Sequence, residues 1–208
     1  MIEYLADRAN AVTACSFFFA VVGVFLALNG QLELGAAAML WTWSLDHWDG
    51  HIARTTRHKR LPGTAAFGKN FDGFGDFVHG VWFPAVVIIL VGDGSVISFV
   101  ASLLLVMAGA IRLSYFENVG LTAEAKFIGI PVSYATPLLA VIMLLRPLIW
   151  AEIFPTMLAL AFTALAALYV STFVQVPAIQ GRAIPIATMA AIALSLALIA
   201  ISLSRGAT

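Results

Sequence analysis

The sequence predicts an all-α fold, a polytopic bundle of about seven transmembrane helices, and three observations support this class. Hydrophobic residues make up 62% of the 208 residues and charged residues only 11%, whereas charged residues form about a quarter of an ordinary soluble protein. The mean hydropathy is +0.98. Apolar segments of about 20 residues, the length that crosses a bilayer, recur along the chain. The chain is therefore expected to be an integral membrane protein.

Each expected span is an apolar segment bounded by turn-forming residues. Turns are indicated at Asn29 and Gly30, around Asp93, at Pro147 and before Pro185. We expect six core helices and a C-terminal helix in one membrane domain over residues 1–208, with spans at 10–28, 33–54, 66–92, 95–117, 127–146, 150–173 and 183–204. The second and third spans contain acidic residues and are retained because those acids can face one another.

Basic residues flank the spans unevenly, and this bias indicates orientation. With a cytoplasmic N-terminus, only Arg146 and Arg205 lie on the outer side. The cytoplasmic side then holds Arg8, Arg54, Arg57, Lys59, Arg60, Lys69, Lys126 and Arg182. We therefore expect the N-terminus inside. The 11 basic and 11 acidic residues balance, and their pattern does not indicate a nucleic-acid partner.

Four aspartates lie inside the second and third apolar segments. Asp46 and Asp49 are three residues apart, and Asp72 and Asp76 are four apart, so each pair shares one helix face. Ionisable groups at membrane depth are costly and usually functional. Both pairs lie near the expected cytoplasmic face, where facing carboxylates must be neutralised. Two divalent cations such as Mg, Mn or Ca, which prefer oxygen ligands, would do this.

Other polar side chains are expected at the same depth. Asn10 and Thr13 begin the first span, and Arg112 lies near the cytoplasmic end of the fourth. The fifth and sixth spans add Ser133, Tyr134, Ser171, Thr172 and Gln175. The outer halves of the spans hold few polar groups. We therefore expect a cavity that opens to the cytoplasm, without a polar path across the membrane.

The acidic segments also match a known pattern of residues. In order, the pattern is Asp46, two residues, Asp49, Gly50, two residues, Ala53, Arg54, then Gly68, three residues, Asp72, three residues, Asp76. It resembles the signature of the CDP-alcohol phosphatidyltransferases, although residues 55–67 form a longer basic loop than that family usually has. NAVT at 10–13, GAIRLSYFE at 109–117, FIGIP at 127–131 and YVSTFVQVP at 169–177 are similar to segments of the phosphatidylserine synthase branch.

The resemblance implies an enzyme of the prokaryotic inner or plasma membrane, working as a homodimer. It would transfer a phosphatidyl group from a CDP-linked lipid, CDP-diacylglycerol, to a small polar alcohol and release CMP. Asp76 is implied as general base, and Asp46, Asp49, Asp72 and Asp76 as ligands of two divalent cations, Mg or Mn. Residues expected to bind the CDP moiety are Asn10, Thr13, Gly50, Ala53, Arg54 and Gly68. Arg112 is expected to bind the acceptor, which for serine means its carboxylate.

Alternatives stay open on the sequence alone. Choline, glycerol phosphate or inositol phosphate could replace serine as the acceptor. Choline, however, has no acidic group for Arg112 to bind, and a phosphorylated acceptor should need more than one basic side chain near the site. A divalent-cation transporter would need polar residues up to the outer face. The lipid tails could be acyl or isoprenoid.

Several residues also have structural interpretations. The aspartates could form a network with Arg54 and Lys69, and Arg112 could extend to the interface. Asn10 and Thr13 could serve in helix packing. His79, one turn after Asp76, could be a metal ligand or could support one, but a packed histidine is the favoured interpretation.

Overall fold

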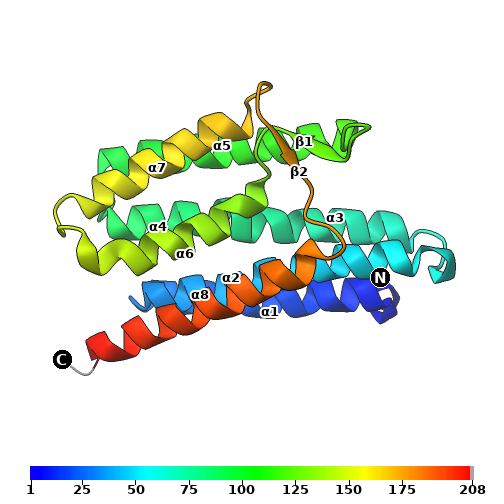
Figure 1. Ribbon diagram of the computed structural model, residues 1–208, viewed down its shortest axis with the longest axis horizontal. Coiled ribbons are helices and arrows are strands. Elements are labelled where there is room, and N and C mark those ends of the chain that lie inside the picture. Colours follow the sequence, from blue (N-terminus) through cyan, green and yellow to red (C-terminus); the bar gives the residue numbers. More distant parts are fainter. Residues whose placement is uncertain (207–208) are drawn as a thin grey trace.

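Long helices lying side by side form the fold in the computed structural model, which describes residues 1–206 (Figure 1). The α-helices are α1 (Arg8–Leu28), α2 (Leu32–Thr55), α3 (Thr64–Phe77), α4 (Phe83–Val91), α5 (Val96–Val119), α6 (Ala135–Leu145), α7 (Phe154–Tyr169) and α8 (Ala183–Gly206). Short 3-10 turns are η1 (Ile2–Ala6), η2 (Arg57–Lys59), η4 (Val132–Tyr134) and η5 (Arg146–Leu148), and η3 (Val78–Trp82) is a π-helical turn. The predicted all-α helix bundle is confirmed.

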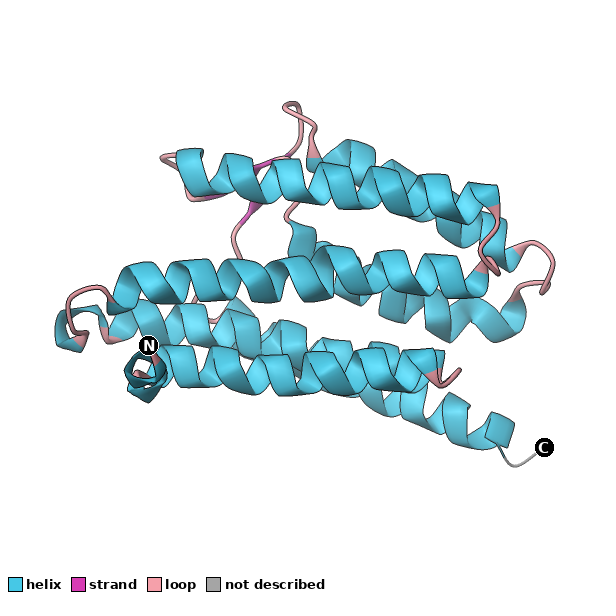
Figure 2. Ribbon diagram, turned by 180° about the vertical axis from the view of Figure 1, so that it is seen from behind, coloured by secondary structure: helices cyan, strands magenta, loops and turns pink. Residues whose placement is uncertain are grey.

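The helices are stacked in layers whose axes run in roughly the same direction. In Figure 1, α1, α2 and α8 lie at the bottom, α3, α4 and α6 in the middle, and α5 and α7 at the top. Helix α2 packs against α1, α6 and α8, and α5 packs against α4 and α7. The two ends of the chain lie at opposite ends of the bundle (Figures 1 and 2).

Within residues 1–206, four helical segments are long and apolar enough to cross a membrane: Arg8–Leu28, Thr64–Val91, Val96–Val119 and Ala183–Arg205. The segments Val132–Leu148 and Phe154–Tyr169 are shorter apolar helices. Helix α2 has 24 residues but a more polar sequence, since it carries Glu33, Asp46 and Asp49. Together these are the seven helical segments expected from the sequence, and they indicate an integral membrane protein.

Glycines allow α1 and α2 to approach each other closely. A Cβ atom on Gly35 would lie 2.8 Å from the carbonyl oxygen of Gly23, and one on Gly23 would lie 3.0 Å from that of Gly35. The N-terminus of α1 is fixed by Asp7, whose carboxylate accepts from the backbone N–H groups of Ala9 and Asn10 at 3.1 and 3.2 Å, a typical N-cap. This tight pair of helices sets the position of the polar residues on α2.

The third predicted span is a continuous helical segment in which the π-helical turn η3 joins α3 to α4. The backbone N–H of Phe83 donates to Val78, five residues back, and Pro84 has no N–H to donate. Two carbonyls in the turn are bonded by hydroxyls from other helices instead: Thr136 donates to His79 O at 2.9 Å, and Tyr169 lies 2.9 Å from Gly80 O. The turn thereby ties α3 and α4 to α6 and α7.

The predicted start of the fifth span, at residue 127, is wrong because this part of the chain forms a short strand. Strand β1 (Lys126–Ile128) pairs antiparallel with β2 (Gln175–Pro177), so residues 126–128 are extended rather than helical. Gly129 has φ 77°, and the following helical segment starts only at Val132. The strand pair joins the loop after α5 to the loop before α8, and both loops reach the pocket described below.

Candidate active site

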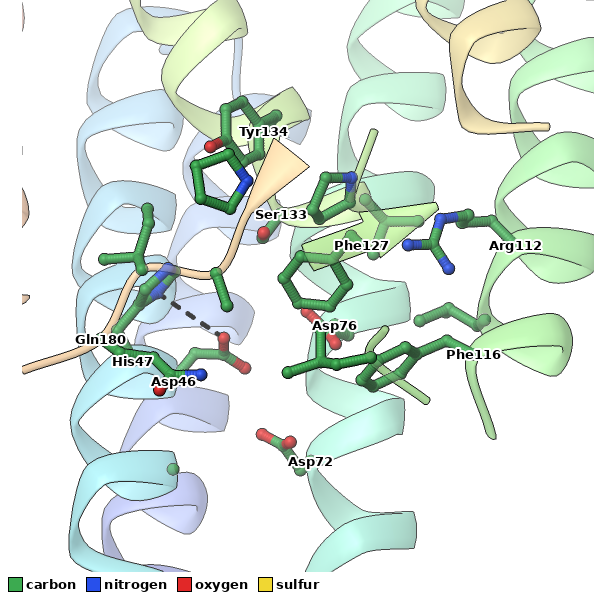
Figure 3. Close-up of a pocket in the computed structure, with 18 of the residues that line it drawn as sticks. Asp46, His47, Asp72, Asp76, Arg112, Phe116, Phe127, Ser133, Tyr134 and Gln180 are labelled. Carbon is green, nitrogen blue, oxygen red and sulfur yellow. Dashed lines mark ion pairs between the residues drawn. The ribbon is translucent and has the colours of Figure 1, made fainter. Parts of the chain in front are cut away.

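Most of the predicted site residues line one pocket. Its walls come from α2, α3, α5, η4 and the loops around β1 and β2. The lining residues are Asp46, His47, Gly50, Arg54, Asp72, Asp76, Arg112, Leu113, Phe116, Leu121, Phe127, Pro131, Val132, Ser133, Tyr134, Pro177, Ala178, Ile179 and Gln180. Figure 3 shows the carboxylates of α2 and α3 facing one another across this space. Residues that are far apart in the sequence, from Asp46 to Gln180, therefore meet at one site.

Three of the aspartates face this pocket from two helices. Asp46 lies on α2, and Asp72 and Asp76 lie on α3 (Figure 3). The side chains of Asp46 and Asp76 are 15% and 24% exposed. The carboxyl of Asp46 is close enough to be repelled by those of Asp72 and Asp76. Like charges at such separations destabilise one another unless a cation intervenes.

Asp49 lies deeper, at the contact between α1 and α2. It is only 3% exposed, and its Oδ2 accepts a hydrogen bond of 2.5 Å from the hydroxyl of Thr13. Thr13, which was predicted to bind the CDP moiety, is thus hydrogen-bonded to one of the four aspartates. The hydrogen bond orients Asp49 and leaves its second oxygen for another partner.

Asn10 and Gly68 lie in a neighbouring network rather than in the lining of the pocket. Arg60 pairs with Asp7 at 3.0 Å and donates to Asn10 Oδ1 at 2.9 Å, while Asn10 Nδ2 donates to the carbonyl of Tyr4 at 2.9 Å. A Cβ on Gly68 would lie 2.4 Å from Asn10 Oδ1. Gly68 thereby makes room for this network, and a role of Asn10 or Gly68 in binding CDP stays a prediction.

The remaining predicted CDP-binding residues lie near one another on α2. Gly50 and Arg54 line the pocket, and a Cβ on Gly50 would lie 3.3 Å from an Nη atom of Arg54. Arg54 is exposed and Ala53 is half-buried. The absence of a side chain at Gly50 therefore leaves the guanidinium of Arg54 room beside the helix.

Arg112 approaches the same pocket from α5. It is only 4% exposed, and its Nε donates to the carbonyl of Ile130 at 3.2 Å. The guanidinium carbon lies 5.8 Å from the ring centre of Phe116 and 5.7 Å from that of Phe127, within the range of cation–π contacts. Arg112 is thus held by the protein inside the bundle and does not extend to the interface.

Two histidines beside the acids were missed as site residues. His79, which was interpreted as a packed residue, is fully buried, and its Nε2 lies 3.8 Å from Asp46 Oδ1 and 3.5 Å from Asp76 Oδ1. His47 also lines the pocket, with its Nδ1 2.8 Å from the carbonyl of Trp43 and 3.8 Å from Asp46 Oδ2. The sequence signal was the spacing of three residues between Asp76 and His79, which puts both on one helix face.

The donor atoms of this site suit a divalent cation. Ligand atoms of Asp46, Asp76 and His79 all lie within 4.8 Å of one another. Among the buried side-chain atoms of the described residues, Asp72 Oδ1 and His79 Nε2 have no hydrogen-bond partner, although buried polar atoms nearly always have one. A cation bound between these side chains would satisfy both atoms and offset the repulsion among the carboxylates.

The fold and the site define a membrane-embedded helix bundle with an acidic pocket between two of its helices. A sequence profile described as CDP-alcohol phosphatidyltransferase matches residues 7–206. The chain belongs to this family.

Two curated relatives are similar over a large part of the chain. Both are named CDP-diacylglycerol–serine O-phosphatidyltransferase and come from Helicobacter pylori, strains J99 and 26695, with 33% and 32% identity over 139 residues. The similar region covers 65% of this chain and 56% of each relative, so the match spans little more than half the length of the relatives.

Proposed function

We propose that this protein transfers a phosphatidyl group from a CDP-linked lipid to the hydroxyl of a small polar alcohol, preferably serine, and releases CMP. The observation that carries the proposal is the arrangement of Asp46, Asp72, Asp76 and Arg112 around one pocket. Family membership supports the transfer reaction, and the names of the two relatives support serine as acceptor.

The four aspartates are proposed to hold two divalent cations, Mg or Mn. Asp46, Asp72 and Asp76 face the pocket, and Asp49 keeps one oxygen beyond its bond with Thr13. When bound, such cations neutralise pyrophosphate oxygens and stabilise the charge that develops during phosphoryl transfer. Arg54, at the exposed side of the pocket, would add guanidinium donors to the phosphate groups.

Asp76 is proposed as the general base. Its carboxylate would accept the proton of the acceptor hydroxyl while the acceptor oxygen bonds to the phosphorus that carries the diacylglycerol. The bond between that phosphorus and the bridging oxygen breaks, and CMP leaves with the bridging oxygen. The carboxylate is 24% exposed, so the proton can then pass to solvent. A positioned base of this kind contributes about 10²- to 10⁴-fold to the rate.

Arg112 is proposed to select an acceptor with a carboxylate. Its Nε is occupied by Ile130, which leaves the two terminal nitrogens for a fork of hydrogen bonds to a carboxylate. Arg112 and Asp76 line the same pocket. Serine can therefore place its carboxylate on Arg112 and its hydroxyl near Asp76. Choline has no acidic group for this guanidinium to bind, and a phosphorylated acceptor would need further basic side chains near Arg112.

The membrane arrangement is proposed to follow the charge bias of the sequence. The bias of eight basic residues against two supports an N-terminus and a pocket at the cytoplasmic face, and we propose that the membrane is a prokaryotic inner or plasma membrane. Residues 1–208 would then form one catalytic membrane domain, assembled as a homodimer.

The test is an acceptor panel with the purified protein in lipid nanodiscs. With CDP-diacylglycerol, Mn²⁺ or Mg²⁺ and radiolabelled serine, we expect equal amounts of lipid product and CMP, and less product with choline, glycerol phosphate or inositol phosphate. Turnover that prefers another alcohol would overturn serine as acceptor. The absence of CMP release with every alcohol, together with Mn²⁺ uptake into liposomes, would overturn the proposed reaction.

A further inference from the structure

His79, in the π-helical turn, is hydrogen-bonded to Thr136 through both its backbone and its side chain. The hydroxyl of Thr136 donates to the carbonyl of His79 at 2.9 Å, and the same oxygen lies 2.9 Å from His79 Nδ1. A hydroxyl has one proton to donate and lone pairs with which to accept. Because that proton goes to the carbonyl, Thr136 accepts from Nδ1–H. Thr136 therefore fixes the tautomer in which Nε2 carries the lone pair.

That lone pair faces the carboxylates. His79 Nε2 lies 3.5 Å from Asp76 Oδ1 and 3.8 Å from Asp46 Oδ1, in a side chain that is 0% exposed. Two carboxylates cannot donate to a lone pair, which explains why Nε2 has no hydrogen-bond partner. Ligands about 2.1 Å from one metal ion are themselves about 3.0–3.4 Å apart. The two distances from Nε2 are close to those within a shared coordination sphere, and all three ligand atoms lie within 4.8 Å of one another.

Neighbouring residues hold the imidazole in this position. A Cβ on Gly80 would lie 2.6 Å from the carbonyl oxygen of Val132, so η3 lies directly against η4, next to Thr136. Tyr169 adds a hydroxyl 2.9 Å from Gly80 O and 3.0 Å from Val132 O. The imidazole is thus oriented by two other helical segments, an arrangement commonly found for metal-binding histidines.

We propose that His79 is a nitrogen ligand of a divalent cation shared with Asp46 and Asp76. The proposal rests on the cation site of the proposed function and adds a nitrogen donor to its oxygen ligands. Imidazole suits transition metals, whereas Mg²⁺ prefers oxygen ligands and water. The site is therefore selective for Mn²⁺ over Mg²⁺. The opposing arrangement is a protonated His79 that pairs directly with the two carboxylates and binds no metal.

The experiment is electron spin echo envelope modulation of Mn²⁺ bound to the wild-type protein, purified through a tag without histidine. We expect ¹⁴N modulation from a directly coordinated imidazole, replaced by ¹⁵N modulation when the histidines are labelled with ¹⁵N. Bound Mn²⁺ without nitrogen modulation would overturn the histidine ligand and leave the proposed phosphatidyl transfer intact. Failure to bind Mn²⁺ at all would overturn both the histidine ligand and the proposed cation site.

Two variants assign the signal to His79. The chain has four histidines, so replacing His47, His51 and His58 by Gln leaves His79 as the only one, and the modulation should persist. His79→Gln should remove the modulation and weaken Mn²⁺ binding by about tenfold or more, with a smaller loss for Mg²⁺. Loss of the signal in the triple variant would overturn the assignment, and this result does not depend on whether His79→Gln folds.

Discussion

Helix α2 carries buried acids at both ends, and the two ends neutralise them differently. Near its start, Glu33 is 5% exposed and is surrounded by arginines: Arg146 donates to its Oε1 at 3.1 Å, and Arg205 donates to the same oxygen. Near its other end, Asp46 and Asp49 lie among further aspartates. Among the described residues, the basic side chains within 4.0 Å of the carboxylates of Asp46 and Asp76 are the imidazoles of His47 and His79, with no lysine or arginine.

The difference is in where the counter-charges come from. Glu33 obtains its counter-charges from η5 and α8, so it ties the start of α2 to these two helical segments. The aspartates keep acceptor oxygens directed into a pocket, and Asp72 Oδ1 has no partner within the described residues. A buried charge without compensation is strongly unfavourable. The acidic end of α2 is therefore where we propose that a cation binds from solution, whereas the Glu33 end already has its counter-charges in the protein.

The largest expected effect is at Asp76, the proposed general base. Asp76→Asn removes the proton acceptor but keeps the shape of the side chain, so we expect the rate of CMP release to fall by about 10²- to 10⁴-fold. Turnover of the purified variant with CDP-diacylglycerol and serine measures this loss. Glu33→Gln is the matched control at the other end of α2 and should keep its turnover. A variant at Asp76 with wild-type turnover would remove that residue from the role of base.

A smaller effect is expected at Arg112, in the proposed acceptor subsite. Arg112→Ala removes hydrogen bonds between charged groups, each worth about 1.5–3 kcal/mol, which corresponds to a rise of about 10- to 150-fold in the KM for serine. Arg57→Ala is the control, since Arg57 is an exposed loop arginine on the same side of the protein. An unchanged KM for serine in Arg112→Ala would show that Arg112 has only a structural role.

The smallest expected effect is on stability. Glu33→Gln removes the charged partner that Arg146 and Arg205 share, and these arginine side chains are 35% and 39% exposed, so water offsets part of the loss. We expect the free energy of unfolding to fall by about 1–3 kcal/mol, seen as a lower Tm in detergent. Glu117→Gln, which breaks the exposed pair with Lys69, should change the Tm much less. Equal Tm values for both variants would contradict the structural role of Glu33.

The helix bundle was predictable because apolar length and turn residues act locally. The limits of the long helices follow the sequence closely, and the helical spacing of the aspartates indicated which of them share a face. The strand pair was not predictable: Phe127 and Ile128 are apolar residues that fit a helix or a strand, and only their pairing with residues 175 and 176 decides between the two.

The finer structure of the site depends on tertiary contacts that the sequence does not display. Asn10 and Gly68 belong to the pattern that resembled a nucleotide site, yet their contacts are with Arg60 from the long basic loop. His79 was interpreted as packing because a lone histidine in an apolar segment is ordinarily buried in the core. Its role depends on Thr136, 57 residues away, and on the π-helical turn before Pro84.

Equilibrium binding of Mn²⁺ to the protein without lipid substrate tests most directly whether the acidic end of α2 is neutralised from solution. We expect saturable binding by the wild-type protein, similar binding by Glu33→Gln, and binding weakened by about tenfold or more in Asp46→Asn and Asp72→Asn. Wild-type protein that binds neither Mn²⁺ nor Mg²⁺, or aspartate variants that bind as tightly as the wild type, would contradict the account.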